Sequence, residues 1–309
     1  MKIATSDFNV IKVFNNNIVL VYQANVEKIL CEKGIGFGKH SGDSISKNAS
    51  IEKTFFIINK INIVNFHELV NSVDEEVIGL CEEIIYMVSK ELNEDLHEKV
   101  HISLIDHIAF TLNRLKNGDN IENPFLNEIE TLFPREFELA QKAATMIEDK
   151  TKIHFPEDEI GFITLHIYAA RNEGGLANTI KYAFVSNTII KMIEDELNVK
   201  IDRKSLDYAR FITHIRFAIQ RILGNIPVQY KLVNTVKRKY DPCFKLAQKI
   251  SKFVERELEL KVVEDETAYL AVHIQKFKSN RSKKRKKLFF EIWIIGMIMA
   301  NEMISEILL

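Results

Sequence analysis

SLIDHIAFTLNR, residues 103–114, and FITHIRFAIQR, residues 211–221, are two versions of one segment. Each version carries a His-Ile pair on an apolar run with helical spacing, and an arginine two helical turns after the histidine. A second matched pair, DEIGFITLHI at 158–167 and DETAYLAVHI at 265–274, also ends in His-Ile. These matches predict that one helical module occurs twice in the chain.

The offset between the two versions is constant at 107 residues, from His107 to His214 and again from His166 to His273. The same offset aligns further pairs: Ile108 with Ile215, Phe110 with Phe217, Arg114 with Arg221, Phe133 with Tyr240, and Phe137 with Phe244. A gap-free offset of this length is too long for a solenoid repeat, so it indicates two tandem domains.

The start of the chain has a β-strand pattern instead. Two β-branched runs, residues 9–14 and 17–23, flank Asn15-Asn16, which favours a tight hairpin turn. Two more strands are predicted at 26–33 and 53–58. Roughly four short strands cannot bury both faces of a sheet alone, so we expect this domain to dimerise.

Helical periodicity begins near Glu75 and continues to about residue 277. We therefore expect an α+β multidomain fold, in which a small antiparallel β domain precedes two tandem all-α helical bundles. The predicted bounds are 1–62 for the β domain, 68–173 and 174–280 for the two helical domains, and 281–309 for a basic and apolar tail outside the repeat.

Charge is distributed unevenly along the chain, although the net charge is only −1. Residues 1–60 carry +3, residues 276–287 carry +8, residues 288–309 carry −3, and residues 61–275 carry −9. A basic first domain ahead of an acidic body suggests that any polyanion binds at the first domain. Acidic and polar residues interrupt the apolar tail, so we expect no stable membrane insertion; a membrane-surface helix or a terminal packing helix remains open.

The three cysteines are far apart and lack a CxxC spacing. This pattern argues against a disulfide framework or a zinc site and favours a reducing cytoplasm. The first ten residues lack the apolar region of a signal peptide, which also favours a cytoplasmic protein. We expect neither a bound metal nor a cofactor.

The four repeated histidines admit several interpretations. They can be hydrogen-bonded core residues that a duplication copied. A metal site is less favoured because the sequence has no HExxH motif or Cys/His cluster, and catalysis would need one asymmetric set of groups. Phosphorylation is the third hypothesis, since a neutral imidazole is a competent nucleophile toward a phosphoryl donor. Arg114 and Arg221 would then neutralise the added charge, unless they are ordinary solvated surface residues.

At this point the motifs resemble a known family, the BglG/SacY-type transcriptional antiterminators. IKVFNNNIVL and KGIGFGKHSGD resemble the motifs of its co-antiterminator (CAT) RNA-binding domain. The four histidine segments resemble those of two phosphotransferase-system regulation domains (PRDs). DHIAF, NPFLNEIETLFPREF and GIGFGK favour the glucose-responsive branch, and the resemblance covers about residues 7–278.

The resemblance implies a homodimer that binds an RNA antiterminator hairpin in the nascent leader transcript and so prevents a terminator from forming. It also implies reversible histidine phosphorylation: a sugar-specific permease, here of the glucose type, acts through its EIIB domain on the first module, and the phosphocarrier HPr acts on the second. The phosphoacceptor candidates are His107 and His166 in the first module, and His214 and His273 in the second.

The RNA-facing candidates carried over from the first domain are Lys12, Asn15, Asn16, Asn17, Lys33, Gly34, Phe37 and Lys39. Lysine suits phosphates, asparagine suits base edges, and Phe37 suits stacking on an unpaired base. Asn15-Asn16 can instead be only a turn, and the glycines only a strand kink. Glu32 and His40 depart from the family, where glycine and lysine are commoner, and the carboxylate of Glu32 is expected to weaken a phosphate contact there.

Two other classes of function remain as alternatives. A DNA-binding activator with the same regulatory modules would need a helix-turn-helix, for which the β-patterned first domain leaves no room. A phosphohistidine relay would pass the phosphoryl group onward, but two near-equivalent modules suit regulation better than turnover. We therefore expect a regulator and not an enzyme, with no catalytic residues.

Overall fold

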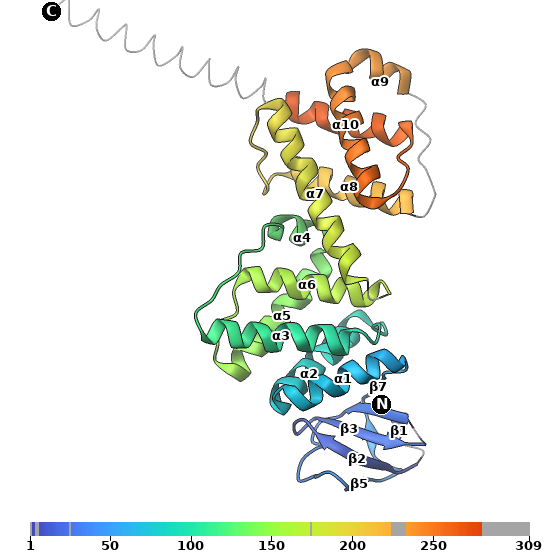
Figure 1. Ribbon diagram of the computed structural model, residues 1–309, viewed down its shortest axis with the longest axis vertical. Coiled ribbons are helices and arrows are strands. Elements are labelled where there is room, and N and C mark those ends of the chain that lie inside the picture. The colour runs from blue at the N-terminus through green and yellow to red at the C-terminus, as the bar shows by residue number, and fades with distance from the viewer. Residues whose placement is uncertain (1, 4–5, 25, 174, 224–232, 280–309) are drawn as a thin grey trace, which may run out of the picture. The chain divides into compact units, whose positions relative to one another are not determined.

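The computed structural model describes residues 2–3, 6–24, 26–173, 175–223 and 233–279, and Figure 1 shows their arrangement. The predicted tail, residues 281–309, lies outside the described residues. The chain divides into two compact units, Met1–Ile180 and Lys181–Leu309. Within the described ranges, no helix is both long enough and apolar enough to cross a membrane.

The first unit begins with an antiparallel five-stranded sheet in the order β5-β2-β3-β4-β7. Its strands are β2 (Phe8–Val13), β3 (Ile18–Gln23), β4 (Val26–Cys31), β5 (Ser44–Ile45) and β7 (Lys53–Phe56), and a separate pair joins β1 (Lys2–Ile3) to β6 (Ser50–Ile51). The predicted hairpin turn lies between β2 and β3, where the Oδ1 of Asn15 accepts hydrogen bonds from the backbone N–H groups of Asn17 (2.8 Å) and Ile18 (2.9 Å). The asparagine therefore stabilises the turn directly.

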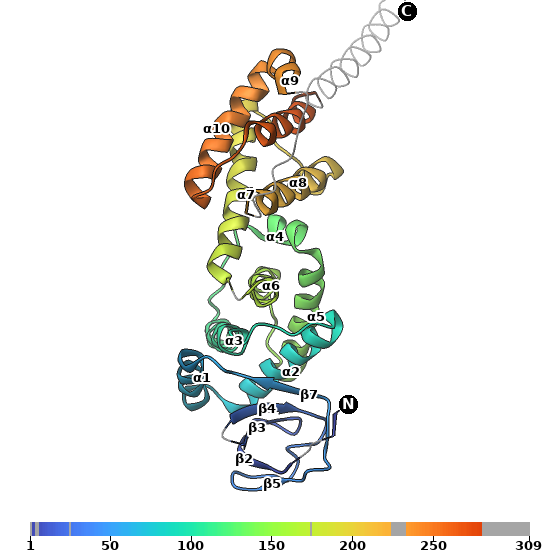
Figure 2. The same ribbon diagram turned by 90° about the vertical axis from the view of Figure 1, so that its right-hand side faces the viewer.

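The helices of the first unit are α1 (Lys60–Ser72), α2 (Glu75–Leu92), α3 (Val100–Lys116), α4 (Leu126–Leu132), α5 (Pro134–Thr151) and α6 (Glu157–Arg171). Helix α6 packs against α3, α4 and α5, as Figure 2 shows. It begins directly after Pro156, where three acidic residues in the first turn favour a helix start. Helix α1 was not expected from the sequence, which suggested helical structure only from about Glu75.

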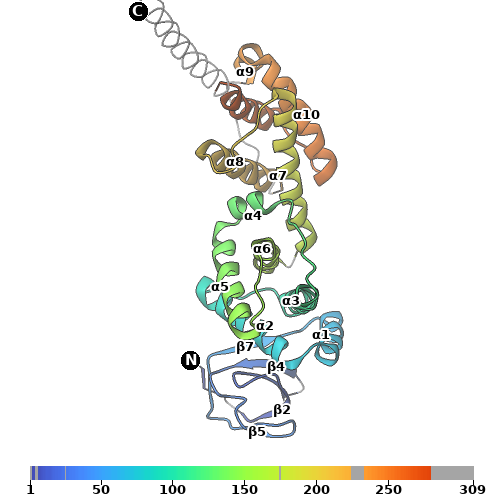
Figure 3. The same ribbon diagram turned by 90° about the vertical axis from the view of Figure 1, so that its left-hand side faces the viewer.

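The sheet and the helices of the first unit share one hydrophobic core. Phe14, which directly follows β2, and Leu20 and Phe55 from the sheet belong to the same buried cluster as Phe66 of α1 and Ile78 of α2. Figure 3 shows α1 and α2 beside the sheet. We predicted that the β domain dimerises because it cannot bury both faces of its sheet alone. In the structure, the first helical module packs against one of these faces.

A buried histidine–glutamate contact lies within this shared core. The Nδ1 of His101 in α3 lies 2.8 Å and 2.9 Å from the two carboxylate oxygens of Glu82 in α2, and both side chains are almost fully buried. The ring of Phe55, from β7, packs at 4.9 Å against the His101 ring. A polar group buried this deeply is costly unless it is hydrogen-bonded. The contact between His101 and Glu82 therefore stabilises the packing of α2, α3 and the sheet against one another.

The second unit repeats the helical plan of the first. Its helices are α8 (Leu206–Leu223), α9 (Val233–Lys239), α10 (Asp241–Leu258) and a helical stretch at 264–279, and α7 (Leu176–Leu197) precedes them across the division between the units. Shifting α4 and α5 by 107 residues gives the bounds of α9 and α10. The predicted architecture, a small antiparallel β domain followed by two helical modules, is confirmed.

Candidate phosphorylation and RNA-binding sites

The two histidines of the first module lie together, although 59 residues separate them in the sequence. His107 of α3 and His166 of α6 have ring centroids 5.0 Å apart, with 30° between the ring planes. His166 is buried, and its Nδ1 lies 3.2 Å from the hydroxyl of Ser103. His107 is half-buried, so it is the more accessible member of the pair.

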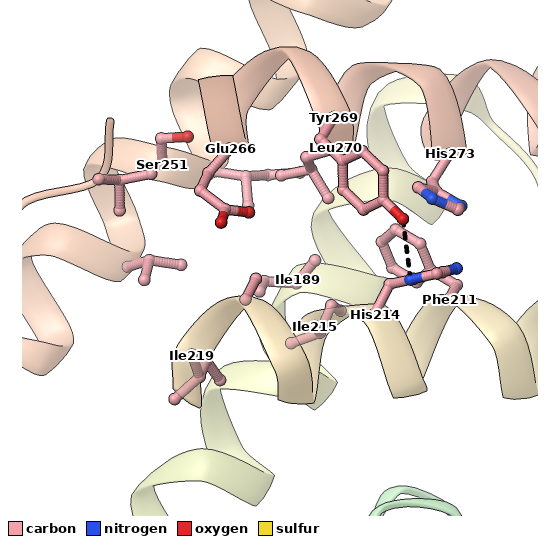
Figure 4. Close-up of a pocket in the computed structure, with 14 residues that line it drawn as sticks. Ile189, Phe211, His214, Ile215, Ile219, Ser251, Glu266, Tyr269, Leu270 and His273 are labelled. Atoms are coloured by element: carbon pink, nitrogen blue, oxygen red, sulfur yellow. Dashed lines mark hydrogen bonds between the residues drawn. The ribbon is translucent and has the colours of Figure 1, made fainter. Parts of the chain in front are cut away.

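The second module has the same arrangement. His214 of α8 and His273 of the 264–279 helix have ring centroids 4.1 Å apart, with 41° between the ring planes. His273 is buried and His214 is half-buried. Figure 4 shows the two rings facing each other beside Tyr269 and Phe211. The structure therefore brings the four predicted histidines together in two equivalent pairs.

Burial keeps most of these imidazoles in the neutral form. Desolvation, reinforced by the nearby His107, lowers the pKa of His166 to about 3. Desolvation, with smaller effects from His214 and Lys276, lowers the pKa of His273 to about 4. The pKa of His214 is also lowered, by desolvation and then by Lys276 and Arg221. A neutral ring is the form that can accept a phosphoryl group, and it is also the form expected of a core histidine.

A buried carboxylate completes the site in the first module. Glu159 is 1% exposed and pairs with the guanidinium Nη2 of Arg114, while its Oε2 accepts a hydrogen bond from Thr111 (3.1 Å). The same Oε2 lies 3.4 Å from the Nε2 of His107. Burial alone would raise the pKa of Glu159, but His107 and Arg114 hold that pKa below its ordinary value. The matched segments 158–167 and 265–274 place Glu159 and Glu266 at equivalent positions, but the sequence predicted no role for either residue.

The corresponding pair in the second module is Arg221 and Glu266. The Nε and Nη2 of Arg221 donate to the two carboxylate oxygens of Glu266 at 2.6 Å and 2.7 Å. Glu266 is buried, and the bidentate geometry is the strong form of this interaction. Arg114 and Arg221 are therefore each paired with a buried carboxylate near a histidine, although the side chain of Arg221 keeps partial contact with water.

A small cavity lies beside the histidines of the second module (Figure 4). Its volume is about 50 Å³, and its lining includes His214, His273, Tyr269 and Glu266 among apolar side chains. This space can hold a few water molecules but not a sugar.

The predicted RNA-binding residues gather at one end of the sheet. The backbone N–H of Gly36 donates to the carbonyl of Asn16 (3.0 Å), and that of Gly34 donates to the Oδ1 of Asn17 (3.0 Å). A Cβ on Gly36 would lie 2.2 Å from the carbonyl oxygen of Asn15, so only glycine allows this approach. The turn and the glycine-containing loop thus form one surface, on which Phe37 is 76% exposed.

Some of these residues instead contact the first helical module. Lys12 donates to the backbone carbonyl of Val70 (2.9 Å) and pairs with Glu75 (3.2 Å). The side-chain amides of Asn15 and Asn17 both donate to Glu83 of α2, at 3.1 Å and 2.9 Å.

A glycine of α2 makes room for this contact. A Cβ on Gly79 would lie 2.5 Å from the amide nitrogen of Asn15, so a larger residue would not fit beside it. Asn16 and Lys33 remain exposed, and the ammonium of Lys39 donates to the carbonyl of Ser44 (2.9 Å).

The chain matches two family models. Residues 8–63 match the CAT RNA binding domain, and residues 82–170 and 187–277 match the PRD domain. Among curated proteins, the transcription antiterminator LicT of Bacillus subtilis is 34% identical over 86% of this chain and 97% of that protein. Protein GlcT of Staphylococcus saprophyticus is 34% identical over 89% of this chain and 99% of that protein.

Further similarity extends to another antiterminator and to a solved structure. The beta-glucoside operon antiterminator of Dickeya chrysanthemi is 30% identical over 87% of this chain and 96% of that protein. A crystal structure of GlcT CAT-PRDI is 38% identical, covers 53% of this chain and 98% of its own, and has a TM-score of 0.46.

Proposed function

The chain belongs to the BglG/SacY-type family of transcription antiterminators, which join a CAT RNA-binding domain to two PRD domains, and on that premise we propose how its own residues carry out antitermination. The sheet end that bears Asn16, Lys33 and Phe37 binds an antiterminator hairpin in the leader transcript. Binding excludes the overlapping terminator, so transcription continues into the genes downstream.

The chemistry of that surface supports this proposal. Phe37 is a large aromatic ring, 76% exposed, on a loop that glycines shape. An exposed ring of this kind can stack on an unpaired base, while Lys33 can contact the phosphate backbone. The domain also carries a net charge of +3 over residues 1–60, which favours a polyanion.

We propose that the two histidine pairs regulate this binding. A sugar permease of the phosphotransferase system, of the glucose type, phosphorylates the first module through its EIIB domain, and HPr phosphorylates the second. The observation that carries this proposal is the duplicated site itself. His107 and His214 are each half-buried, and the ring of each lies beside that of a buried histidine, near an Arg–Glu pair. The protein acts in the cytoplasm as a homodimer.

Phosphoryl transfer to the purified full-length chain tests this regulation. The chain is incubated with phosphoenolpyruvate, the general phosphotransferase enzyme and HPr, with or without the glucose permease, and the modified residues are identified by mass spectrometry. We expect stable phosphate on His214 or His273 with HPr, and on His107 or His166 only when the permease is present. Absence of phosphate from all four histidines would contradict the proposal, and rapid onward transfer to a sugar would favour a relay enzyme instead.

A further inference from the structure

The two histidine sites differ at one position that touches the accessible histidine. Position 162 in the first module is phenylalanine, and the equivalent position in the second module is Tyr269. The hydroxyl of Tyr269 lies 3.2 Å from the Nδ1 of His214, with the two ring planes at 84°. Phe162 packs against His107 in a similar edge-on manner, with centroids 5.9 Å apart, but has no hydroxyl to offer.

The buried carboxylates of the two sites, Glu159 and Glu266, also differ in the groups that they contact. Glu159 approaches His107 at the Nε2 atom, at 3.4 Å. Glu266 instead gives both its oxygens to Arg221, and the histidine contact is taken over by Tyr269 at the Nδ1 atom. Figure 4 shows the second nitrogen of the His214 ring pointing away from Tyr269.

The contact at Nδ1 bears on which nitrogen can react. A neutral imidazole carries one proton, so one nitrogen donates a hydrogen bond and only the other has a free electron pair. If Nδ1 donates to the phenol oxygen, the electron pair is on Nε2, the nitrogen that points away from Tyr269. The pKa of His214 is lowered mainly by desolvation, which keeps this ring neutral near pH 7.

We propose that Tyr269 is a positioning residue that holds His214 in the Nδ1–H tautomer and makes Nε2 its phosphoryl acceptor. This inference rests on the proposed phosphorylation of His214 by a phosphohistidine donor. The Nε2 electron pair forms the new N–P bond, and the donor's N–P bond breaks with its electrons returning to the donor imidazole, which takes up a proton from solvent. The His214 ring gains positive character during transfer, so its Nδ1–H becomes a stronger donor to the Tyr269 oxygen. The Nδ1 proton is kept in this hydrogen bond or released to solvent afterwards.

The test compares Tyr269→Phe with Phe162→Tyr in the full-length chain. Each variant is phosphorylated by phosphoenolpyruvate, the general phosphotransferase enzyme and HPr. The rate is followed by mass spectrometry of the His214 peptide, and the isomer, Nε2- or Nδ1-phosphohistidine, is identified by its ³¹P and ¹⁵N resonances. Tyr269→Phe changes one oxygen atom and gives the residue found in the first module, so the helix packing should be kept, which thermal unfolding checks.

We expect the unmodified chain to carry only Nε2-phosphohistidine at His214. In Tyr269→Phe the transfer rate should fall about tenfold, because the hydrogen bond that strengthens in the transition state is lost, and Nδ1-phosphohistidine should appear. Phe162→Tyr, the matched control, should leave His214 unchanged. An unchanged or faster rate in Tyr269→Phe, with Nε2 still the only acceptor, would overturn the role of Tyr269. Absence of phosphate from His214 in the unmodified chain would instead count against the proposed regulation itself.

Discussion

Arg221 and Glu266 form a bidentate ion pair whose two members differ in burial. The side chain of Glu266 is 3% exposed and that of Arg221 is 27% exposed. Loss of the arginine strands a charge in the protein interior, whereas loss of the carboxylate leaves a guanidinium that can still reach water. Removing the arginine should therefore cost more stability than removing the carboxylate, because the carboxylate is the more deeply buried of the two groups.

This asymmetry predicts different costs for the two single substitutions. Arg221→Gln should lower the free energy of unfolding by about 3 kcal/mol, because Glu266 is left buried and unpaired. Glu266→Gln should cost about 1 kcal/mol, close to the value of an ordinary hydrogen bond. Urea denaturation of the two variants measures both, and a larger loss for Glu266→Gln would contradict the burial argument.

The buried histidines predict a loss of stability in mild acid. Desolvation lowers the pKa of His273 to about 4 in the folded chain, from its ordinary 6.5 in the unfolded chain. Below about pH 6.5 the unfolded state therefore binds a proton that the folded state does not, so the free energy of unfolding falls as the pH falls from 6.5 toward 4. For His273 we expect a loss on the order of 2 kcal/mol between pH 6.5 and pH 5.

A substitution isolates this effect from other titrating groups. In His273→Gln the free energy of unfolding should fall less steeply over the same pH interval, whatever its value at pH 7. Urea denaturation at pH 7, 6 and 5 gives the slope for each protein. Equal slopes for the variant and the unmodified chain would show that His273 is not buried in the neutral form.

At the scale of elements, helix α2 contacts the end of the sheet that bears the predicted RNA-binding residues. Lys12, Asn15 and Asn17 donate to groups of α1 and α2, chiefly Glu83, and Gly79 provides the space for Asn15. An amide or ammonium group that is oriented toward α1 or α2 has only its remaining N–H groups to offer to RNA. Contact with α2 and full contact with an RNA hairpin should therefore compete.

Weakening this contact should strengthen RNA binding by the full-length chain. We expect Glu83→Gln to raise the affinity for a leader hairpin severalfold, and Gly79→Ala to do the same without loss of helix stability, because alanine is the better helix former. Glu76→Gln is the matched control, since Glu76 lies on the same helix but pairs with Lys150. Filter binding or fluorescence anisotropy measures all three. Unchanged affinity in both Glu83→Gln and Gly79→Ala would exclude the competition.

The elements also show which parts of the fold a sequence can predict. The β2–β3 hairpin was predicted because Asn15 acts locally, through its own backbone neighbours. Helix α1 was missed because it packs on the sheet beside α2 through a few residues such as Phe66 and Val70, and other apolar residues of α1, among them Ile61 and Val64, are exposed. Its helical period is therefore weak, and tertiary packing stabilises it instead.

The candidate histidine sites were also predicted only in part from the sequence. The constant offset of 107 residues predicted that His107 and His214 are equivalent, but not which side chains each would meet. Glu159 and Glu266 occupy equivalent positions in the matched segments, but an acid in the first turn of a helix is already explained by the helix dipole. Their pairing with arginines on another helix depends on how the helices pack, which periodicity alone does not give.

At the scale of the whole molecule, the charge distribution predicts how binding responds to salt. Lys12, Lys33 and Lys39 are the lysines of the first domain that we predict to contact RNA. Each phosphate contact contributes about −0.7 to −0.9 to the slope of log affinity against log salt concentration. Lys33→Ala should weaken binding to all RNAs alike and reduce that slope by about 1. A change in sequence preference without a change in slope would show that Lys33 contacts a base instead.

The most direct test of an RNA-binding antiterminator is equilibrium binding of the full-length chain to the leader RNA of its own operon. Affinity for the hairpin that overlaps the terminator is measured beside a scrambled RNA of equal length and composition, at several salt concentrations. The account predicts at least about tenfold tighter binding to the hairpin, with an advantage that persists as salt weakens both complexes. Equal affinity for the hairpin and the scrambled RNA would contradict it.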